Sequence, residues 1–384
     1  MTAGPQRPGC RRLAAAAVVL LSCLCAAAGT AQTRNAPNKR TLGMQQEAAK
    51  LIDLPDAAYG ALDDRALDAL SRRLSELASR HVEAPENAAQ ARAMPALLVA
   101  ASPRRVAAEA VSQWPLLVGQ QTSGWRAWTV SWRLNARVLI ADLQSGQLAT
   151  PLLEVSEKRQ RAPAPSMSRA VPNDFDAATV STGVTRYRPF ADLVAPDAAL
   201  PARYALTVIA FDWKSNTVVT TVSPRTGAPP QMLPRRVASP TPGVVSAAAS
   251  GAPLLTLKAP SRVEPGRPLQ VTASLDLSVE EGAVIAAVGS SSNAPTLLAV
   301  NAVLIRRDAD SPVVVPLWVP AQVQGPTGPG QRASATFSFD LNRLHDTTEL
   351  RGLCQLYLVA GRHTLGPHPV VMGDLNGPEA LHAR

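Results

Sequence analysis

The chain of 384 residues carries 38 basic and 29 acidic side chains, which gives a formal net charge of +9 at neutral pH. Its length and its 46% of hydrophobic residues are sufficient for two or three domains with hydrophobic cores. The arginines are interleaved with acidic residues and form no block of about five or six like charges, which argues against a nucleic-acid partner.

The first 31 residues have the layout of a secretory signal peptide. Three arginines precede an apolar run over residues 13–28, and the small residues Gly29–Ala31 follow it. This run is shorter than the ~20 residues that a membrane-spanning helix needs. We therefore expect cleavage before Gln32, no integral membrane segment after cleavage, and a periplasmic or extracellular location. The alternatives are a leader that is retained as an anchor and lipidation at Cys23.

Loss of this leader would remove three arginines and no acidic residue, and would lower the net charge from +9 to +6. It would also remove Cys10, Cys23 and Cys25, so that Cys354 alone remains. One cysteine cannot form an intramolecular disulfide, and the exported protein must therefore be stabilised by its hydrophobic cores.

Residues 32–94 are predicted to be helical. Met44–Ile52 should form a short helix that ends before Pro55, and Asp63 or Asp64 can cap a longer one. Charged side chains occupy the outer face of that longer helix, and leucines recur on its other face at helical spacing, at positions 67, 70, 74 and 77.

Residues 95–222 are predicted to form a first strand-rich block. In WTVSWRLN, Trp128–Asn135, apolar and polar side chains alternate, as in a strand with one buried face. Proline and arginine between Val155 and Asp174 indicate an irregular loop. The other strands expected in this block are Arg137–Leu143, Leu148–Val155, Thr179–Tyr187, Tyr204–Phe211 and Thr217–Val222.

Residues 223–253 are rich in Pro, Ser, Ala and Gly and are predicted to be a linker. Proteolysis near Arg225 or near Arg235–Arg236 should therefore release a stable C-terminal fragment. Residues 254–375 form the second predicted strand-rich block, and 376–384 a tail. The predicted fold is mainly β, with a short helical segment followed by two antiparallel β-sandwich domains. The strands expected in the second block are Leu254–Lys258, Leu269–Leu277, Val284–Val288, Thr296–Ile305, Val313–Val319, Ala333–Asp340, Cys354–Val359 and Pro369–Met372.

Two pairs of segments within the chain have similar sequences. VLIADLQSGQLAT, residues 138–150, resembles TVIAFDWKSNTVVT, residues 207–220, and hairpin turns at Ser145–Gly146 and Ser215–Asn216 would explain the match. A shift of 150 residues places LPARYALTVIA, from Leu200, over LRGLCQLYLVA, from Leu350. This second similarity predicts that both blocks end alike, with a strand, a loop and a closing hairpin.

LTLKAPSRVEPGRPLQVTASLDL, residues 255–277, is similar to the first two strands of immunoglobulin-like or fibronectin type III-like modules of exported bacterial proteins. Tyr204 stands where that family places its corner tyrosine, whereas Cys354 takes this position in the second block. Neither block has the family's paired cysteines. The resemblance implies an Ig-like fold, and a fold alone does not imply a function.

Tryptophan is unevenly distributed, with five of the six residues in the first block. Trp128 and Trp132 should be part of the core, because aromatic side chains dominate core burial. Trp125 and Trp213 fall at a strand entry and a hairpin tip, where exposed rings could stack on a sugar or a peptide. We predict these two residues as candidate ligand-binding positions.

His363 and His368 flank the turn GRHTLGPHP and are the candidate metal ligands, because a zinc or copper site needs several converging donors. No nucleophile elbow and no phosphate-binding loop is present in the sequence. The prediction is therefore an exported, non-catalytic protein without a cofactor, which binds a protein or cell-wall glycan partner or acts as a structural adaptor. The alternative is a secreted hydrolase or metal-dependent enzyme with its site in the histidine-containing turns.

Overall fold

The computed structural model describes residues 29–30, 39–94, 96–124, 136–151, 153, 174–188, 202–210, 213–223, 254–264, 267–278, 285–287, 296–307, 309, 311–324, 331–344, 351–361 and 363–373. Over these residues the protein is mainly β, which confirms the predicted class. Four predicted segments lie wholly or almost wholly outside the described residues: the leader, the strand Trp128–Asn135, the linker and the C-terminal tail.

The N-terminal segment is helical, as predicted. Its helices are α2 (Lys39–Ile52), α3 (Asp56–Gly60), α4 (Asp64–His81) and α5 (Ala88–Ala93). The Asp63 side chain caps α4 by accepting a hydrogen bond from the Ala66 N–H at 2.8 Å. The leucine stripe of α4 lies against the sheet, with Leu74 fully buried.

Strands of the first block form two sheets. The three-stranded sheet has the order β2-β4-β7, and the five-stranded sheet has the order β3-β9-β8-β5-β6, in which β3 runs parallel to β9. A 3₁₀ helix, Ala108–Gln113, and the short helix α8 (Asp174–Ala178) complete the described part of this block. The strands are β2 (Leu97–Ala101), β3 (Arg105–Ala107), β4 (Leu116–Ser123), β5 (Arg137–Asp142), β6 (Leu148–Ala149), β7 (Val180–Tyr187), β8 (Ala202–Ala210) and β9 (Trp213–Ser223).

The nine described strands of the second block, together with β1, form one ten-stranded sheet that folds over on itself. Eight of them follow the order β10-β12-β16-β15-β14-β17-β18-β11, and β1 and β13 pair beside this path. β15 (Val313–Gln324) belongs to both halves, because residues 313–321 pair with β14 and residues 322–324 pair with β16. We call β11, β18, β17, β14 and the first part of β15 the inner half, and β10, β12 and β16 the outer half. The other elements are β1 (Gly29–Thr30), which pairs with β16, β13 (Ile285–Ala287), which pairs with β14, β10 (Leu254–Lys258), β11 (Arg262–Val263), β12 (Gln270–Ser278), β14 (Thr296–Arg306), β16 (Arg332–Asp340), α9 (Leu341–Leu344), β17 (Gly352–Ala360) and β18 (His363–Met372).

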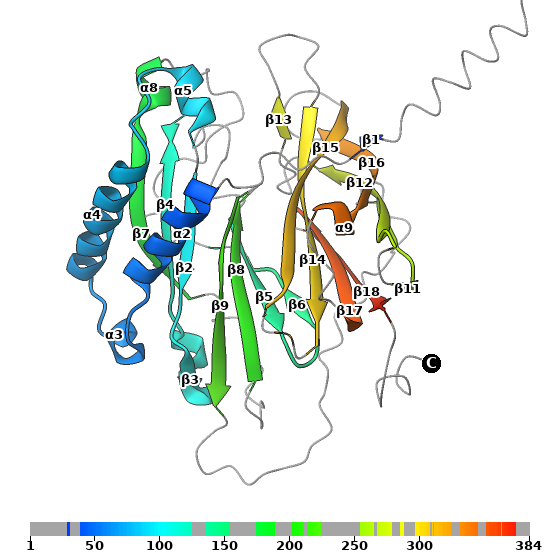
Figure 1. The fold of residues 1–384 in the computed structure, drawn as a ribbon, viewed down its shortest axis with the longest axis horizontal. Coiled ribbons are helices and arrows are strands. Elements are labelled where there is room, and N and C mark those ends of the chain that lie inside the picture. Colours follow the sequence, from blue (N-terminus) through cyan, green and yellow to red (C-terminus); the bar gives the residue numbers. More distant parts are fainter. Residues whose placement is uncertain are drawn as a thin grey trace, which may run out of the picture.

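The elements stack in layers, and buried apolar clusters lie between them (Figure 1). α2 and α4 cover the outer face of the three-stranded sheet, whose other face packs on the five-stranded sheet. The five-stranded sheet in turn packs on the inner half, and the inner half on the outer half. The five-stranded sheet and the inner half are therefore buried on both faces, which explains why β8 and β17 are almost continuously apolar in sequence.

The strand order of the first block recurs in the second. The three-stranded sheet β2-β4-β7 corresponds to the outer half, β10-β12-β16. The five-stranded sheet β3-β9-β8-β5-β6 corresponds to the inner half, β11-β18-β17-β14-β15. In both blocks the short first strand of the larger sheet is parallel to its neighbour, β3 to β9 and β11 to β18. β8 and β17 begin and end 150 residues apart, and each is followed by an antiparallel partner strand. The predicted similarity between the ends of the two blocks is confirmed.

The two blocks share a buried cluster between the five-stranded sheet and the inner half. It contains equivalent positions of both repeats: Leu139 and Ala141 of β5 with Val303 and Ile305 of β14, and Ile209 of β8 with Val359 of β17. Because each block covers apolar side chains of the other, we now expect a chain cut within residues 224–253 to stay associated rather than to release a free C-terminal fragment.

The similarity between residues 138–150 and residues 207–220 does not reflect the same turn in both segments. The Asp142 carboxylate organises the first turn by accepting hydrogen bonds from Gln144 N–H and Ser145 N–H, and Gly146 has a φ of 75°. This turn is confirmed. Ser215 and Asn216 instead lie inside β9, so the second predicted turn is wrong.

Gly119 of β4 lies beneath side chains of both α2 and α4. A Cβ atom there would lie 2.8 Å from Val99 Cγ2 and 3.0 Å from Leu74 Cδ2. We expect Gly119→Ala to lower the free energy of unfolding by about 1–3 kcal/mol, the usual cost of overpacking, as measured by urea denaturation. Gly183→Ala on β7 is the control, since a Cβ atom there has no neighbour within 4 Å, and an equal loss in both variants would contradict this explanation.

Candidate functional site

Of the two candidate ligand-binding tryptophans, only Trp213 lies among the described residues. Trp125 lies outside the described residues. Trp213 does not lie at an exposed hairpin tip: it is the first residue of β9, is 7% exposed, and belongs to the apolar cluster that also contains Trp318 of β15. The expectation of an exposed ring at Trp213 is therefore wrong, because β9 begins earlier than the sequence indicated.

The two candidate metal ligands lie on one strand. His363 and His368 are both in β18, opposite Ala360 and Leu356 of β17, and the His368 Nε2 lies 2.9 Å from the Ala259 carbonyl oxygen. Within the part of the chain that the structure describes, no group of three or more His, Cys, Asp or Glu residues is arranged to hold a metal ion. Among the described residues, none joins these two histidines as a further ligand.

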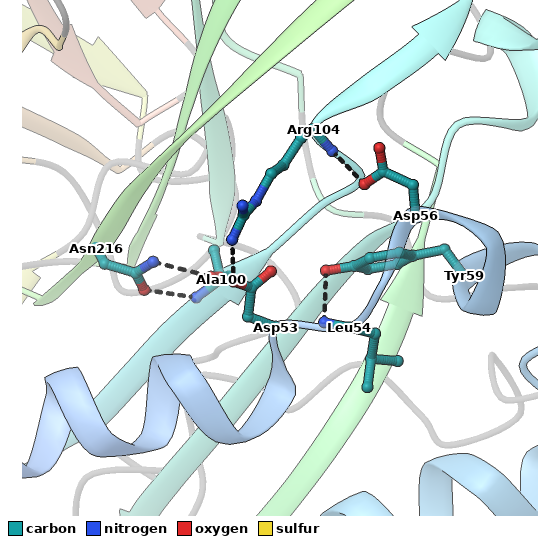
Figure 2. A network of polar contacts seen from close by, with 7 residues as sticks. All are labelled: Asp53, Leu54, Asp56, Tyr59, Ala100, Arg104 and Asn216. Carbon is teal, nitrogen blue, oxygen red and sulfur yellow. Dashed lines mark hydrogen bonds and ion pairs between the residues drawn. The ribbon is translucent and has the colours of Figure 1, made fainter.

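The most developed polar network joins the α2–α3 connection to the β2–β3 connection (Figure 2). Both oxygens of Asp56 accept backbone hydrogen bonds, from Arg104 N–H at 2.7 Å and from Arg105 N–H at 3.2 Å. The Arg104 guanidinium pairs with the Asp53 carboxylate at 3.1 Å, and its side chain is 77% exposed. Because an exposed ion pair of this kind contributes only about 0–1 kcal/mol, the backbone hydrogen bonds to Asp56 do more to hold the connection.

Tyr59 of α3 is the buried member of this network. Its hydroxyl oxygen accepts a hydrogen bond from the Leu54 N–H at 3.3 Å, and its ring is 1% exposed. Burial raises the pKa of Tyr59 to about 12. The buried ring and the hydrogen bond to Leu54 anchor α3.

Two carboxamides connect the helices and the three-stranded sheet to the five-stranded sheet. The Asn216 side chain of β9 accepts a hydrogen bond from the Ala100 N–H and donates one to the Ala100 carbonyl oxygen, both at 2.9 Å (Figure 2). The carboxamide thus bonds to the backbone of β2 as a neighbouring strand would. The Gln45 side chain of α2 donates to the carbonyl oxygens of Leu98 at 2.8 Å and Lys214 at 2.9 Å. These contacts fix the relative positions of the first three layers.

Polar contacts also cross between the two blocks. Tyr357 OH donates to the Gly146 carbonyl oxygen at 2.9 Å, and the hydroxyls of Thr150 and Thr364 lie 2.8 Å apart. Lys214 is an exposed residue, but its ammonium group reaches the second block and donates to the Val314 carbonyl oxygen at 2.7 Å. Burial of that ammonium group lowers the pKa of Lys214.

A different surface distinguishes the second block from the first. The outer face of the three-stranded sheet is apolar and covered by α2 and α4, whereas the outer face of the outer half carries short hydroxyl side chains. Thr272 and Ser338 lie 2.9 Å apart across neighbouring strands, and Ser274 and Thr336 lie 3.1 Å apart. We call this surface the hydroxyl face; its residues are Thr256, Thr272, Ser274, Thr336 and Ser338.

Sequence reasoning did not identify the network around Asp56 or the hydroxyl face. The acids of the network flank Pro55, and Arg104 follows Pro103, but these residues are about 50 positions apart and share no periodic pattern. The hydroxyl face did have a signal, since Ser and Thr alternate with apolar residues in VTASLDL and in ASATFSF. That alternation identifies the strands, but not that no described helix or sheet covers their polar face.

Comparison with known proteins does not assign the chain to a family: no protein-family model matches it, and no curated protein is similar enough in sequence to be recognised as a relative. Among the described helices, none has both the length and the apolar composition required to cross a membrane.

Removal of the Tyr59 hydroxyl should reduce the sensitivity of the fold to alkali. Because the folded state raises the pKa of Tyr59 from 10.0 to about 12, this residue's contribution to stability is complete below pH 10 and is lost as the pH rises through 12. Urea denaturation at intervals between pH 9 and about 12 should show a smaller decrease in the unfolding free energy for Tyr59→Phe than for the wild type. Parallel decreases in the two proteins would contradict this prediction.

Proposed function

We propose that the protein is an exported, non-catalytic binding or structural adaptor protein built from two immunoglobulin-like modules. If β13 is set aside, each block has eight described strands in the same arrangement. The first, third and sixth strands along the chain form one sheet, and the other five form the second sheet in the order second, eighth, seventh, fourth, fifth. Ig-like sandwiches place their strands A, B and E on one sheet and G, F and C on the other, which supports this comparison.

The observation that carries the binding role is the contrast between the two outer faces. In one module the face is apolar and covered by helices of the same chain, and in the other it is hydroxyl-rich and has Thr256, Thr272 and Thr336 exposed. A flat array of short hydroxyl groups can exchange its hydrogen bonds for those of a polar partner without reorganising long side chains. The hydroxyl face is therefore the proposed contact surface for a cell-wall glycan or a protein.

Binding can be tested with lysine substitutions at the centre of this face. We expect the wild type to be retained on insoluble cell-wall polysaccharide. Purified Thr272→Lys and Thr336→Lys proteins should lose this retention and should keep the melting temperature of the wild type. Ser79→Lys on α4 adds the same charge on the helical layer and should be retained like the wild type. Equal retention of all four proteins would exclude the hydroxyl face, and absence of retention for the wild type would exclude the glycan.

Export is supported by the order of arginines, apolar residues and small residues in the first 31 positions. N-terminal sequencing of protein recovered from a periplasmic fraction should give Gln32 as the first residue, and protein that begins at Met1 in the cytoplasm would exclude export. Metal analysis of the same material tests the enzyme alternative, because bound zinc or copper that is lost on substitution of His363 and His368 by alanine would favour it.

A further inference from the structure

One edge of β16 has few strand partners among the residues that the structure describes. On one side β12 pairs with β16 over its whole length, from Arg332 to Asp340. On the other side β15 pairs only with Arg332–Ser334, because its remaining residues pair with β14 in the inner half. From Ala335 onward, Gly29 and Thr30 of β1 are the described residues that pair with this edge, opposite Phe337 and Ser338 and in parallel orientation.

The equivalent edge in the first block is protected differently. There β7 takes the place of β16, and the Ser71 hydroxyl of α4 accepts a hydrogen bond from the Val184 N–H at 2.9 Å. The Arg186 side chain of β7 also donates to the Leu62 carbonyl oxygen, just before α4. A helix thus covers the edge of β7, whereas a short segment of the N-terminal leader pairs with the edge of β16. An uncovered edge offers backbone N–H and C=O groups to another strand.

We propose that the edge of β16 from Ala335 to Phe339 is an acceptor site for an extended strand of a partner protein, added parallel to β16. The inference rests on the proposed export, because cleavage before Gln32 removes the two residues that occupy the edge. Gly29 and Thr30 occupy the site in the precursor, and the partner's strand takes their place in the mature protein. This mode of recognition obtains affinity from backbone hydrogen bonds and specificity from alternate side chains.

The side chains of β16 define the sequence that the partner needs. Ala335, Phe337 and Phe339 face the buried cluster between the two halves, and Thr336 and Ser338 face the hydroxyl face. Residues paired across neighbouring strands share a face, so the added strand requires small or apolar residues opposite the first set and polar residues opposite the second. Gly29 opposite Phe337 and Thr30 opposite Ser338 follow this rule. A peptide strand fits this edge, whereas a glycan cannot reproduce the spacing of its backbone groups.

Amide hydrogen exchange can test the site with the full chain, the chain that begins at Gln32, and a synthetic peptide of residues 26–32. Amides within Ala335–Phe339 should exchange at least about tenfold faster in the shortened chain than in the full chain, and should slow again when the peptide is added. A peptide with Gly29→Pro and Thr30→Pro should have no effect, because proline lacks the N–H and cannot extend a ladder. The edge of β10 on the far side of the outer half is the internal control.

Equal exchange of Ala335–Phe339 in the two chains, without a response to the peptide, would overturn the proposal. Equal protection by the proline peptide would also overturn it, because the peptide would then not be binding as a strand. These outcomes are distinct from failure of the proposed function: a protein that retains Met1 in the cell disproves export, whereas the exchange experiment still determines whether β16 accepts a strand.

Discussion

Replacing Trp213 by alanine should lower the free energy of unfolding by about 3–5 kcal/mol, the usual range for a large aromatic side chain in a core. The ring is 7% exposed and belongs to the cluster between the two sheets of the first block. The same cluster includes Trp318 and Ala299 of the second block, so the cavity would weaken contacts within the first block and between the two blocks.

Chemical denaturation followed by circular dichroism measures this loss, and Trp213→Phe, which keeps a ring in the cluster, should retain a larger part of the stability. A loss under about 1 kcal/mol for the alanine variant would mean that Trp213 is a surface residue, as the sequence suggested. Because the ring is buried, loss of ligand binding in Trp213→Ala would reflect loss of structure rather than loss of a stacking surface.

Tyr357→Ala should be equally damaging and should destabilise both blocks. The Tyr357 ring is 1% exposed in the cluster that joins the blocks, and its hydroxyl donates to the Gly146 carbonyl oxygen of the first block. Removal of the ring leaves a cavity and an unpaired carbonyl oxygen, at a combined cost of about 3–5 kcal/mol. Tyr357→Phe keeps the ring and should cost only about 1–3 kcal/mol, because it still leaves the Gly146 carbonyl oxygen without this hydrogen bond.

The distribution of tryptophan makes this prediction measurable. Five of the six tryptophans belong to the first block, so their fluorescence reports mainly on that block, whereas circular dichroism reports on both. In Tyr357→Ala the denaturation midpoints of both signals should fall together. A lower dichroism midpoint with an unchanged fluorescence midpoint would show that the blocks fold independently.

Much of the secondary structure could be predicted from local pattern. The leucine stripe and the capping Asp63 identified α4, and the segment Leu254–Lys258 was predicted with the bounds of β10. β2 and β4 were not predicted, although they are strands of five and eight residues. Both are covered on two faces, by helices on one side and by the five-stranded sheet on the other, so their apolar residues do not alternate.

The candidate site residues were harder to predict because exposure is a property of the tertiary structure. Trp213 was placed at a turn on the evidence of Ser215 and Asn216, which tolerate turns but here lie within β9. Asn216 is needed there because its carboxamide bonds to the backbone of Ala100, more than 100 residues earlier in the chain. A contact of that sequence separation leaves no local pattern.

By itself the sequence determined the helical N-terminal segment, the mainly β class and the 150-residue repeat of the closing hairpins, because side-chain periodicity and turn residues act over a few positions. Tertiary structure alone decided that both blocks share one strand order and that they pack through equivalent strands. It also decided that helices cover one outer face, while on the other outer face the described residues include no covering layer. These features depend on which apolar faces meet, and strands that are buried on both faces have the same sequence pattern whichever layer covers them.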